Sequence, residues 1–251
     1  MISGAARRPV SAVCFDLDDT LFPQAAWLDG AWAAVARRAA DDGVDPSALR
    51  AALDNVAARG SDRGRIIDRA LERVGAHDVA VAPLVEAFRA HRAETLEPYP
   101  GVRSALAELA ARVPLGLVSD GDPTLQQGKL AALALEAPFR AVVWSDEHGR
   151  GHRKPDPLPF RLALERLGCQ PDEAVFIGDR PEKDVAGACA AGMRAIRVRT
   201  GEWEREPDDD RAWASVATVA DACALLRPAL VRQPVSTSTS TRNSNSPGAN
   251  R

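Results

Sequence analysis

Residues 10–21 read VSAVCFDLDDTL, and this stretch decides the fold. The run from Val10 to Phe15 is short, mostly apolar and partly β-branched, which predicts a strand buried on both faces, as in a parallel sheet. Asp16 and Asp18 follow at once. Because side chains alternate along a strand, these two carboxylates are expected to point the same way at its carboxyl end, where they repel each other unless a cation or a proton intervenes. A turn or a helix cap would account for the same residues.

Short apolar runs and helical patterns alternate through most of the remaining chain. Four further strands are predicted at residues 115–118, 141–144, 174–177 and 195–198. Helices are predicted between them at residues 101–112, 124–134, 158–168, 183–191 and 215–226. Continuously apolar strands that alternate with helices indicate an α/β fold, with an open parallel-sheet, Rossmann-like core covered on both faces.

One long segment after the first strand breaks this alternation, because no strand pattern interrupts it. Its helical patterns cover residues 24–41, 46–59, 64–74 and 80–92. They predict a small α-helical domain, residues 23–96, inserted into a core formed by residues 9–22 and 97–227. Residues 228–251 include the polar run VSTSTSTRNSNSPGAN, which cannot bury a core, so disorder is predicted there and at residues 1–8.

The composition excludes several classes of protein. The 251 residues carry 35 acidic and 32 basic side chains, and this near balance argues against a nucleic-acid partner, which requires a basic surplus. No apolar run approaches the roughly 18–20 residues of a membrane helix, and no apolar segment near the N-terminus indicates a signal peptide. The four scattered cysteines are expected to be reduced rather than paired or metal-bound, so we predict a cytoplasmic protein without a membrane partner.

Two polar stretches that follow predicted strands could bind an anion. Ser119-Asp120-Gly121 offers a hydroxyl and loop N–H groups to a phosphate oxygen, although the same residues suit an ordinary strand-to-helix turn. Lys154 is one of three lysines in the chain and precedes a helix that Asp156 can cap. It is either a fixed ammonium that neutralises an anionic substrate or a solvated surface lysine.

A further acidic stretch, residues 178–184, follows the predicted strand before it. Its Asp179 and Asp184 could cap a turn or a helix. However, Asp16, Ser119 and Asp179 all lie at or just past the carboxyl ends of predicted parallel strands, and ligands bind at that edge of an open α/β sheet. Several carboxylates, a hydroxyl and a lysine suit an anion bridged to the protein by a divalent cation, and hard oxygen ligands favour Mg²⁺.

The runs FDLDDTLF, SDG, KPDP and IGDRPEKD resemble, in order and spacing, the four motifs of the haloacid dehalogenase-like (HAD) hydrolase superfamily. The resemblance covers about residues 10–200. It implies a HAD-like core in which the first strand lies beside the fourth, which would bring Asp16 next to Asp179. The helical insert resembles the cap domain that follows the first motif in the phosphatase branch of this superfamily.

The same resemblance implies roles for individual residues. Asp16 would be the nucleophile that attacks phosphorus to form an aspartyl-phosphate, and Asp18 would protonate the leaving alcohol and then activate water. The groups that hold the phosphoryl group and the substrate would be Thr20, Ser119, Asp120 and Lys154, the last also counted as catalytic. The ligands of Mg²⁺ would be Asp16, the Asp18 backbone carbonyl, Asp179 and, in support, Asp184. Asp120 departs from the asparagine that many relatives have.

The predicted activity is that of a Mg²⁺-dependent phosphomonoesterase acting on a small-molecule phosphate ester. Superfamily members that cleave carbon–halogen bonds lack the second aspartate, so Asp18 favours phosphoester cleavage. The cap arginines within residues 59–65 could meet a second anionic group of the substrate or form an exposed turn. The alternatives are a phosphotransferase or phosphomutase on the same fold and, less favoured, a non-catalytic phosphate-binding module. The oligomeric state is left open.

Overall fold

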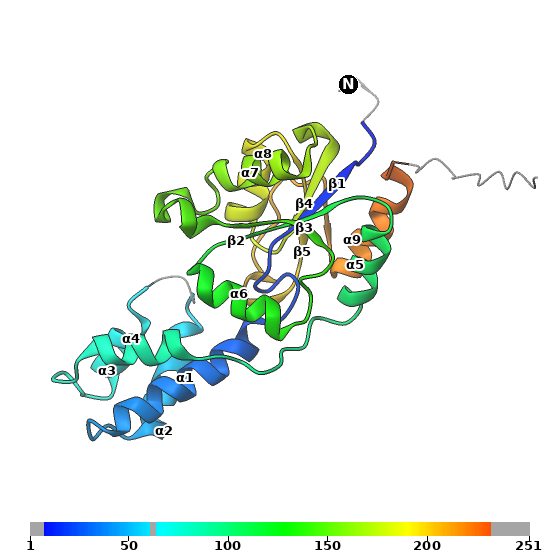
Figure 1. Cartoon of the computed structure of the whole chain (residues 1–251). Coiled ribbons are helices and arrows are strands. Elements are labelled where there is room, and N and C mark those ends of the chain that lie inside the picture. The colour runs from blue at the N-terminus through cyan, green and yellow to red at the C-terminus, as the bar shows by residue number, and fades with distance from the viewer. Residues whose placement is uncertain (1–7, 61–63, 232–251) are drawn as a thin grey trace, which may run out of the picture.

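The computed structural model describes residues 8–60 and 64–231 and contains a six-stranded sheet with helices on both faces (Figure 1). The strands are β1 (Ala12–Phe15), β2 (Leu115–Ser119), β3 (Phe139–Trp144), β4 (Ala174–Gly178), β5 (Arg194–Val198) and β6 (Ala214–Val216). All neighbours are parallel, and their order is β3-β2-β1-β4-β5-β6. Phe15 pairs with Leu117 on one side and with Ile177 on the other. The α/β class and the contact between the first and fourth strands are therefore confirmed.

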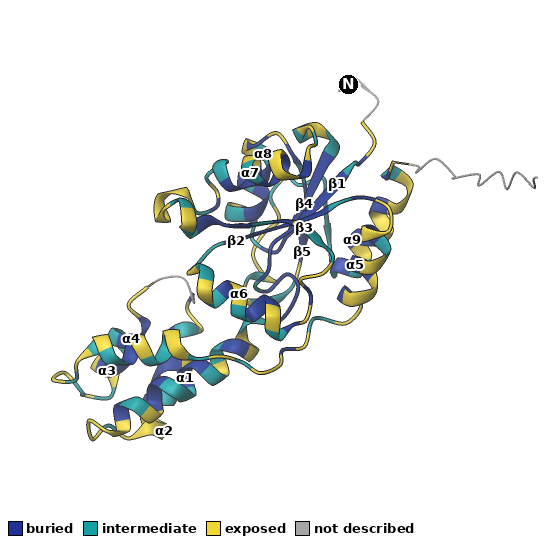
Figure 2. Cartoon of the chain, in the orientation of Figure 1, coloured by how far each residue is buried: buried dark blue, intermediate teal, exposed yellow. Residues whose placement is uncertain are grey.

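Apolar residues of the strands alternate between two cores, one on each face of the sheet. The helices of this part are α5 (Val102–Ala110), α6 (Pro123–Ala132), α7 (Leu158–Leu167), α8 (Ala186–Ala190) and α9 (Val219–Leu226). Phe15 belongs to a buried cluster that includes side chains of α5 and α9, whereas Cys14 belongs to a second cluster with Phe160 of α7. Figure 2 shows the strands as the buried centre of the molecule, with exposed residues on the outer sides of the helices.

The sixth strand differs from the prediction. The pattern predicts a helix from residue 215, but residues 214–216 pair with β5 and the helix begins only after Thr218. Thr218 and Asp221 form a capping box, in which each side chain accepts a hydrogen bond from the backbone N–H of the other. A three-residue edge strand is too short for hydrophobic alternation to reveal it.

The first four helices after β1 are grouped apart from the sheet (Figure 1). They are α1 (Gln24–Ala40), α2 (Pro46–Ala57), α3 (Ile66–Arg73) and α4 (Val81–Ala90). Their apolar faces meet in a separate buried cluster that contains Trp32, Leu53, Leu71 and Leu84. This group of helices (the helical insert) has its own core, as an inserted domain requires.

The ordered core extends slightly beyond its predicted end. Disorder is predicted from residue 228, yet Leu230 is buried, and Val10 exchanges backbone hydrogen bonds with Ala229 and Val231. The prediction was four residues early, because these bonds add the chain beside the start of β1. The rest of the predicted tail, and residues 1–7, lie outside the described residues. Within the part of the chain that is described, no helix has the length and apolar character needed to cross a membrane.

Candidate active site

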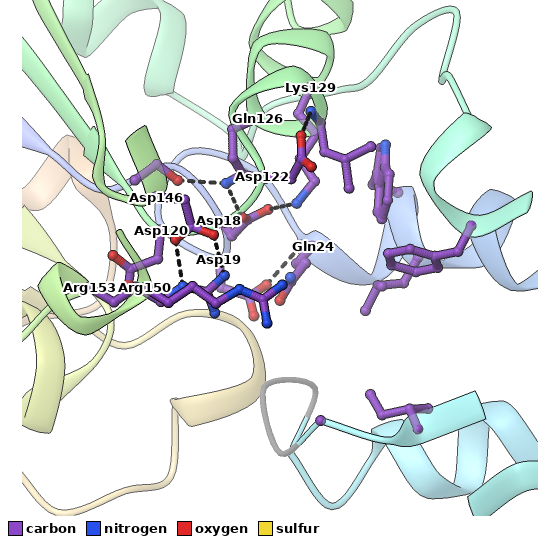
Figure 3. Close-up of a pocket in the computed structure, with 18 of the residues that line it drawn as sticks. Asp18, Asp19, Gln24, Asp120, Asp122, Gln126, Lys129, Asp146, Arg150 and Arg153 are labelled. Carbon is purple, nitrogen blue, oxygen red and sulfur yellow. Dashed lines mark hydrogen bonds and ion pairs between the residues drawn. The ribbon is translucent and has the colours of Figure 1, made fainter. Parts of the chain in front are cut away.

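The predicted site residues meet at the carboxyl edge of the sheet. Asp16 follows β1, Ser119 ends β2 and Asp179 follows β4, as the parallel arrangement requires. They line a cleft of about 750 Å³ between the sheet and the helical insert. Figure 3 shows charged side chains on the sheet side of this cleft and apolar side chains of the insert opposite them.

Three buried carboxylates form the centre of the site. Asp16, Asp179 and Asp184 each offer an oxygen, and these oxygens all lie within 4.8 Å of one another. Burial raises the pKa of Asp16 to about 7, with Lys154 opposing the shift and Asp184 adding to it. Burial, together with Asp184 and Asp16, also raises the pKa of Asp179 well above its usual range. The expected meeting of Asp16 and Asp179 is therefore present, and their charges disfavour the ionised state without a cation.

Lys154 lies among these carboxylates and is not a surface lysine. Its Nζ donates to Asp16 Oδ1 at 2.5 Å and to Asp184 Oδ1 at 2.7 Å, and the residue is 4% exposed. Burial opposes the charged form, but the surrounding carboxylates, Asp16 first and then Asp184 and Asp120, raise the pKa of Lys154. The ammonium is therefore fixed in its charged form beside Asp16.

Two residues predicted to contact the substrate are held by protein groups, and their contact with the substrate stays a prediction. Thr20 is fully buried, and its hydroxyl donates to Asp16 Oδ2 at 3.4 Å and to Asp179 Oδ1 at 3.3 Å. Asp120 Oδ1 accepts from the Ser145 hydroxyl and from the backbone N–H of Lys154. Thr20 thus orients two carboxylates, and Asp120 anchors the loop that carries Lys154, although Asp120 also lines the cleft.

The side chain of Asp18 points away from the three-carboxylate cluster, toward α6. Its Oδ1 accepts from Lys129 Nζ at 2.8 Å and its Oδ2 from Gln126 Nε2 at 2.7 Å. The same Gln126 amide donates to the Ser119 hydroxyl at 2.6 Å, which joins the predicted phosphate-binding hydroxyl to Asp18. The predicted contact of Asp18 with the metal, through its backbone carbonyl, stays a prediction, since its carboxylate is not part of the cluster.

Gln126 and Lys129 were missed by the sequence interpretation. Both are buried, although both are polar and lie on the surface helix α6. Their spacing of three residues places them on one side of that helix, and Lys129 is one of only three lysines. These two facts were the available signal, but the sequence does not show that this side of α6 faces the cleft.

Arg197 is a second residue that sequence patterns did not single out. It lies in β5 and is fully buried. Its guanidinium donates to the backbone carbonyls of Asp179 (3.3 Å), Trp203 (2.7 Å) and Glu206 (2.7 Å) and to Asp208 Oδ1 (2.7 Å). One side chain thus ties the loop after β5 to the backbone of an acidic residue in the site.

Comparisons with known proteins agree with this geometry. A family model described as haloacid dehalogenase-like hydrolase matches residues 10–192. A glyceraldehyde 3-phosphate phosphatase from Methanopyrus kandleri is 36% identical over 210 residues, which are 80% of this chain and 89% of that protein. A phosphoserine phosphatase from Thermus thermophilus is 41% identical over 151 residues, 59% of each protein. The crystal structure of a 2-haloacid dehalogenase from Pseudomonas syringae matches with a TM-score of 0.61 and 29% identity, over 86% of this chain and 98% of that one.

Proposed function

This chain belongs to the haloacid dehalogenase-like hydrolase family, as its four motifs indicated, and we propose that it is a Mg²⁺-dependent phosphatase that forms an aspartyl-phosphate on Asp16. It is a phosphoric monoester hydrolase acting on small phosphorylated metabolites, like the phosphatases to which it is similar. One observation carries the proposal: Lys154 bridges Asp16 and Asp184, and Asp18 lies at the edge of this group on the cleft side.

The acidic cluster fits a bound magnesium ion. Its ligands would be carboxylate oxygens of Asp16, Asp179 and Asp184, which are hard donors. Among the residues that the structure describes, Asp179 Oδ2 is buried without a hydrogen-bond partner, so one acidic oxygen is left unsatisfied there. When bound, the ion would offset the repulsion among the carboxylates and the negative charge of the phosphoryl oxygens.

The residues of the chain divide the chemistry between two carboxyl groups. Asp16 attacks phosphorus, so that a bond between its carboxylate oxygen and phosphorus forms as the ester bond to the leaving alcohol breaks. Asp18 gives its proton to the leaving oxygen, and its carboxylate then takes a proton from the water that hydrolyses the aspartyl-phosphate. Phosphate leaves and both aspartates return to their starting forms.

Lys154 and Ser119 hold the phosphoryl group during this exchange. The Lys154 ammonium is fixed next to Asp16 before substrate arrives, so little reorganisation is needed when negative charge develops on the phosphoryl oxygens. The Ser119 hydroxyl ends β2 at the same edge of the sheet and lines the cleft. The Gln126 amide donates to this hydroxyl, which leaves the Ser119 O–H to donate to a phosphoryl oxygen.

The proposal is tested by following phosphate release from a panel of metabolite phosphates with and without Mg²⁺. Asp16→Asn is expected to lower turnover by at least about 1,000-fold. Asp172→Asn, the same change at an exposed residue in a surface ion pair with Arg8, is the matched control and should leave turnover unchanged. Full activity of Asp16→Asn would exclude Asp16 as the nucleophile. Phosphate that stays in organic form would favour the alternative, a phosphotransferase or phosphomutase.

A further inference from the structure

Lys129 presents a buried positive charge to the cleft beside the catalytic groups. Its side chain is 5% exposed, and Nζ lies 2.8 Å from Asp18 Oδ1. Within the described residues, this is its one hydrogen bond, so two of its three N–H donors remain for a ligand. A buried ammonium with unused donors in a cleft wall is a site for an anionic group.

In the described part of the chain, Lys129 forms no ion pair with a carboxylate other than Asp18. Its ammonium lies 4.6 Å from the centroid of the Trp27 ring, which belongs to helix α1 of the helical insert. Leu28 and Phe88 line the same side of the cleft. An aromatic face compensates only part of the cost of burying an ammonium, so an anionic partner in the cleft is favourable for Lys129.

The contact with Asp18 places Lys129 next to the proposed chemistry. Both oxygens of the Asp18 carboxyl group are occupied, by Lys129 and by Gln126. In the proposed function Asp18 serves the leaving oxygen of the ester, so the Lys129 ammonium lies one contact away from the group that serves the breaking bond.

We propose that Lys129 binds a carboxylate on the organic part of the substrate, so that the enzyme prefers phosphate esters of hydroxy acids to those of neutral alcohols. This inference rests on the proposed function, because it places the leaving oxygen beside Asp18. Asp18 contacts Lys129 directly, so the second anionic group lies only a few bonds from the ester oxygen. Lys129 is then a specificity-determining residue, supplied by the core and not by the cap arginines.

The experiment compares two esters of similar size, phosphoglycolate, which carries a carboxylate, and n-propyl phosphate, which does not. We expect the wild-type kcat/KM to favour phosphoglycolate by at least about tenfold, and Lys129→Met to bring the two values within about threefold of each other, mainly through KM for phosphoglycolate. Lys129→Arg should restore part of the preference. Arg103→Met, which removes one positive charge from an exposed position on α5, is the control and should keep the wild-type ratio.

A binding measurement keeps this inference separate from the proposed function. Calorimetry in the presence of Mg²⁺ compares phosphonoacetate with propylphosphonate, neither of which is hydrolysed as a phosphate ester. Tighter binding of phosphonoacetate by the wild type, lost in Lys129→Met, supports the inference even if no ester is turned over. The absence of turnover would contradict only the proposed function. If Lys129→Met does not unfold cooperatively, Lys129→Gln takes its place. A wild-type ratio near one, or a preference unchanged in the variant, overturns the inference.

Discussion

Replacing Arg197 by methionine tests whether the loop after β5 holds the acidic site in place. Methionine fills a similar volume but donates no hydrogen bond, so the substitution removes all four bonds of the guanidinium. The carbonyl of Asp179 is buried and loses this donor. The other three acceptors are the carbonyls of Trp203 and Glu206 and the carboxylate of Asp208. Their bonds to Arg197 are only partly buried, so water can reach these acceptors in the variant.

The size of the effect follows from this difference in burial. A buried acceptor left without a donor costs about 1–3 kcal/mol, and the half-buried acceptors cost less because they can be rehydrated. The variant no longer has to bury a charged guanidinium, and this gain offsets part of the lost stability. We therefore expect a loss of about 3 kcal/mol in the free energy of unfolding, or about 6–12 °C in Tm for a protein of this size.

Thermal unfolding of the metal-free protein is the assay, and Arg199→Met is the matched control. Arg199 also pairs with Asp208, but its side chain is 49% exposed, so its removal should leave Tm almost unchanged. Because Arg197 anchors the backbone of Asp179, we also expect Arg197→Met to weaken Mg²⁺ binding by about tenfold. The reasoning is refuted if Arg197→Met costs less than about 1 kcal/mol, or if the two variants lower Tm equally.

Three further predictions concern the acidic cluster. Burial raises the pKa of Asp16 to about 7, so folding favours its protonated form, and the Tm of the metal-free protein should fall as the pH rises toward 7. Above that pH, Mg²⁺ should restore the Tm. An equal effect of Mg²⁺ on the Tm of Asp179→Asn would contradict the assignment of Asp179 as a metal ligand. A Cβ at Gly178 would overlap the Asp184 carboxylate, so Gly178→Ala should weaken Mg²⁺ binding by at least about tenfold in calorimetry. Gly151→Ala, where a Cβ meets nothing within 4 Å, should not. Lys154→Met should lower kcat by about 100- to 1,000-fold in the phosphate-release assay, and a loss below tenfold would mean that Lys154 does not stabilise the transferring group.

The features that the sequence predicted well are local ones. The buried strand before Asp16, the parallel α/β class and the helical segments between β1 and β2 follow from patterns within a few turns or strands. The convergence of Asp16 and Asp179 was also predictable, because parallel strands bring their carboxyl ends to one edge and the resemblance to the HAD superfamily implied which strands are neighbours.

The features that were missed depend on contacts between distant residues. Lys129 and Gln126 contact Asp18 across more than 100 positions, and nothing in α6 itself shows which of its sides faces the cleft. Arg197 lies in a strand whose pattern predicts only apolar burial, and its acceptors are carbonyl groups that every residue type possesses. The hydroxyl of Thr20 lies between Asp16 and Asp179, a contact that its place in the first motif does not reveal.

The amino-acid sequence alone therefore determined the type of fold, the order of the strands that carry Asp16 and Asp179, and the chemical class of the reaction. Only the tertiary structure decided which donor holds each carboxylate, namely Lys154 at Asp16 and Lys129 at Asp18. The reason is physical: hydrophobic periodicity acts over a few residues, whereas the partner of a buried charge is set by how whole helices pack against the sheet.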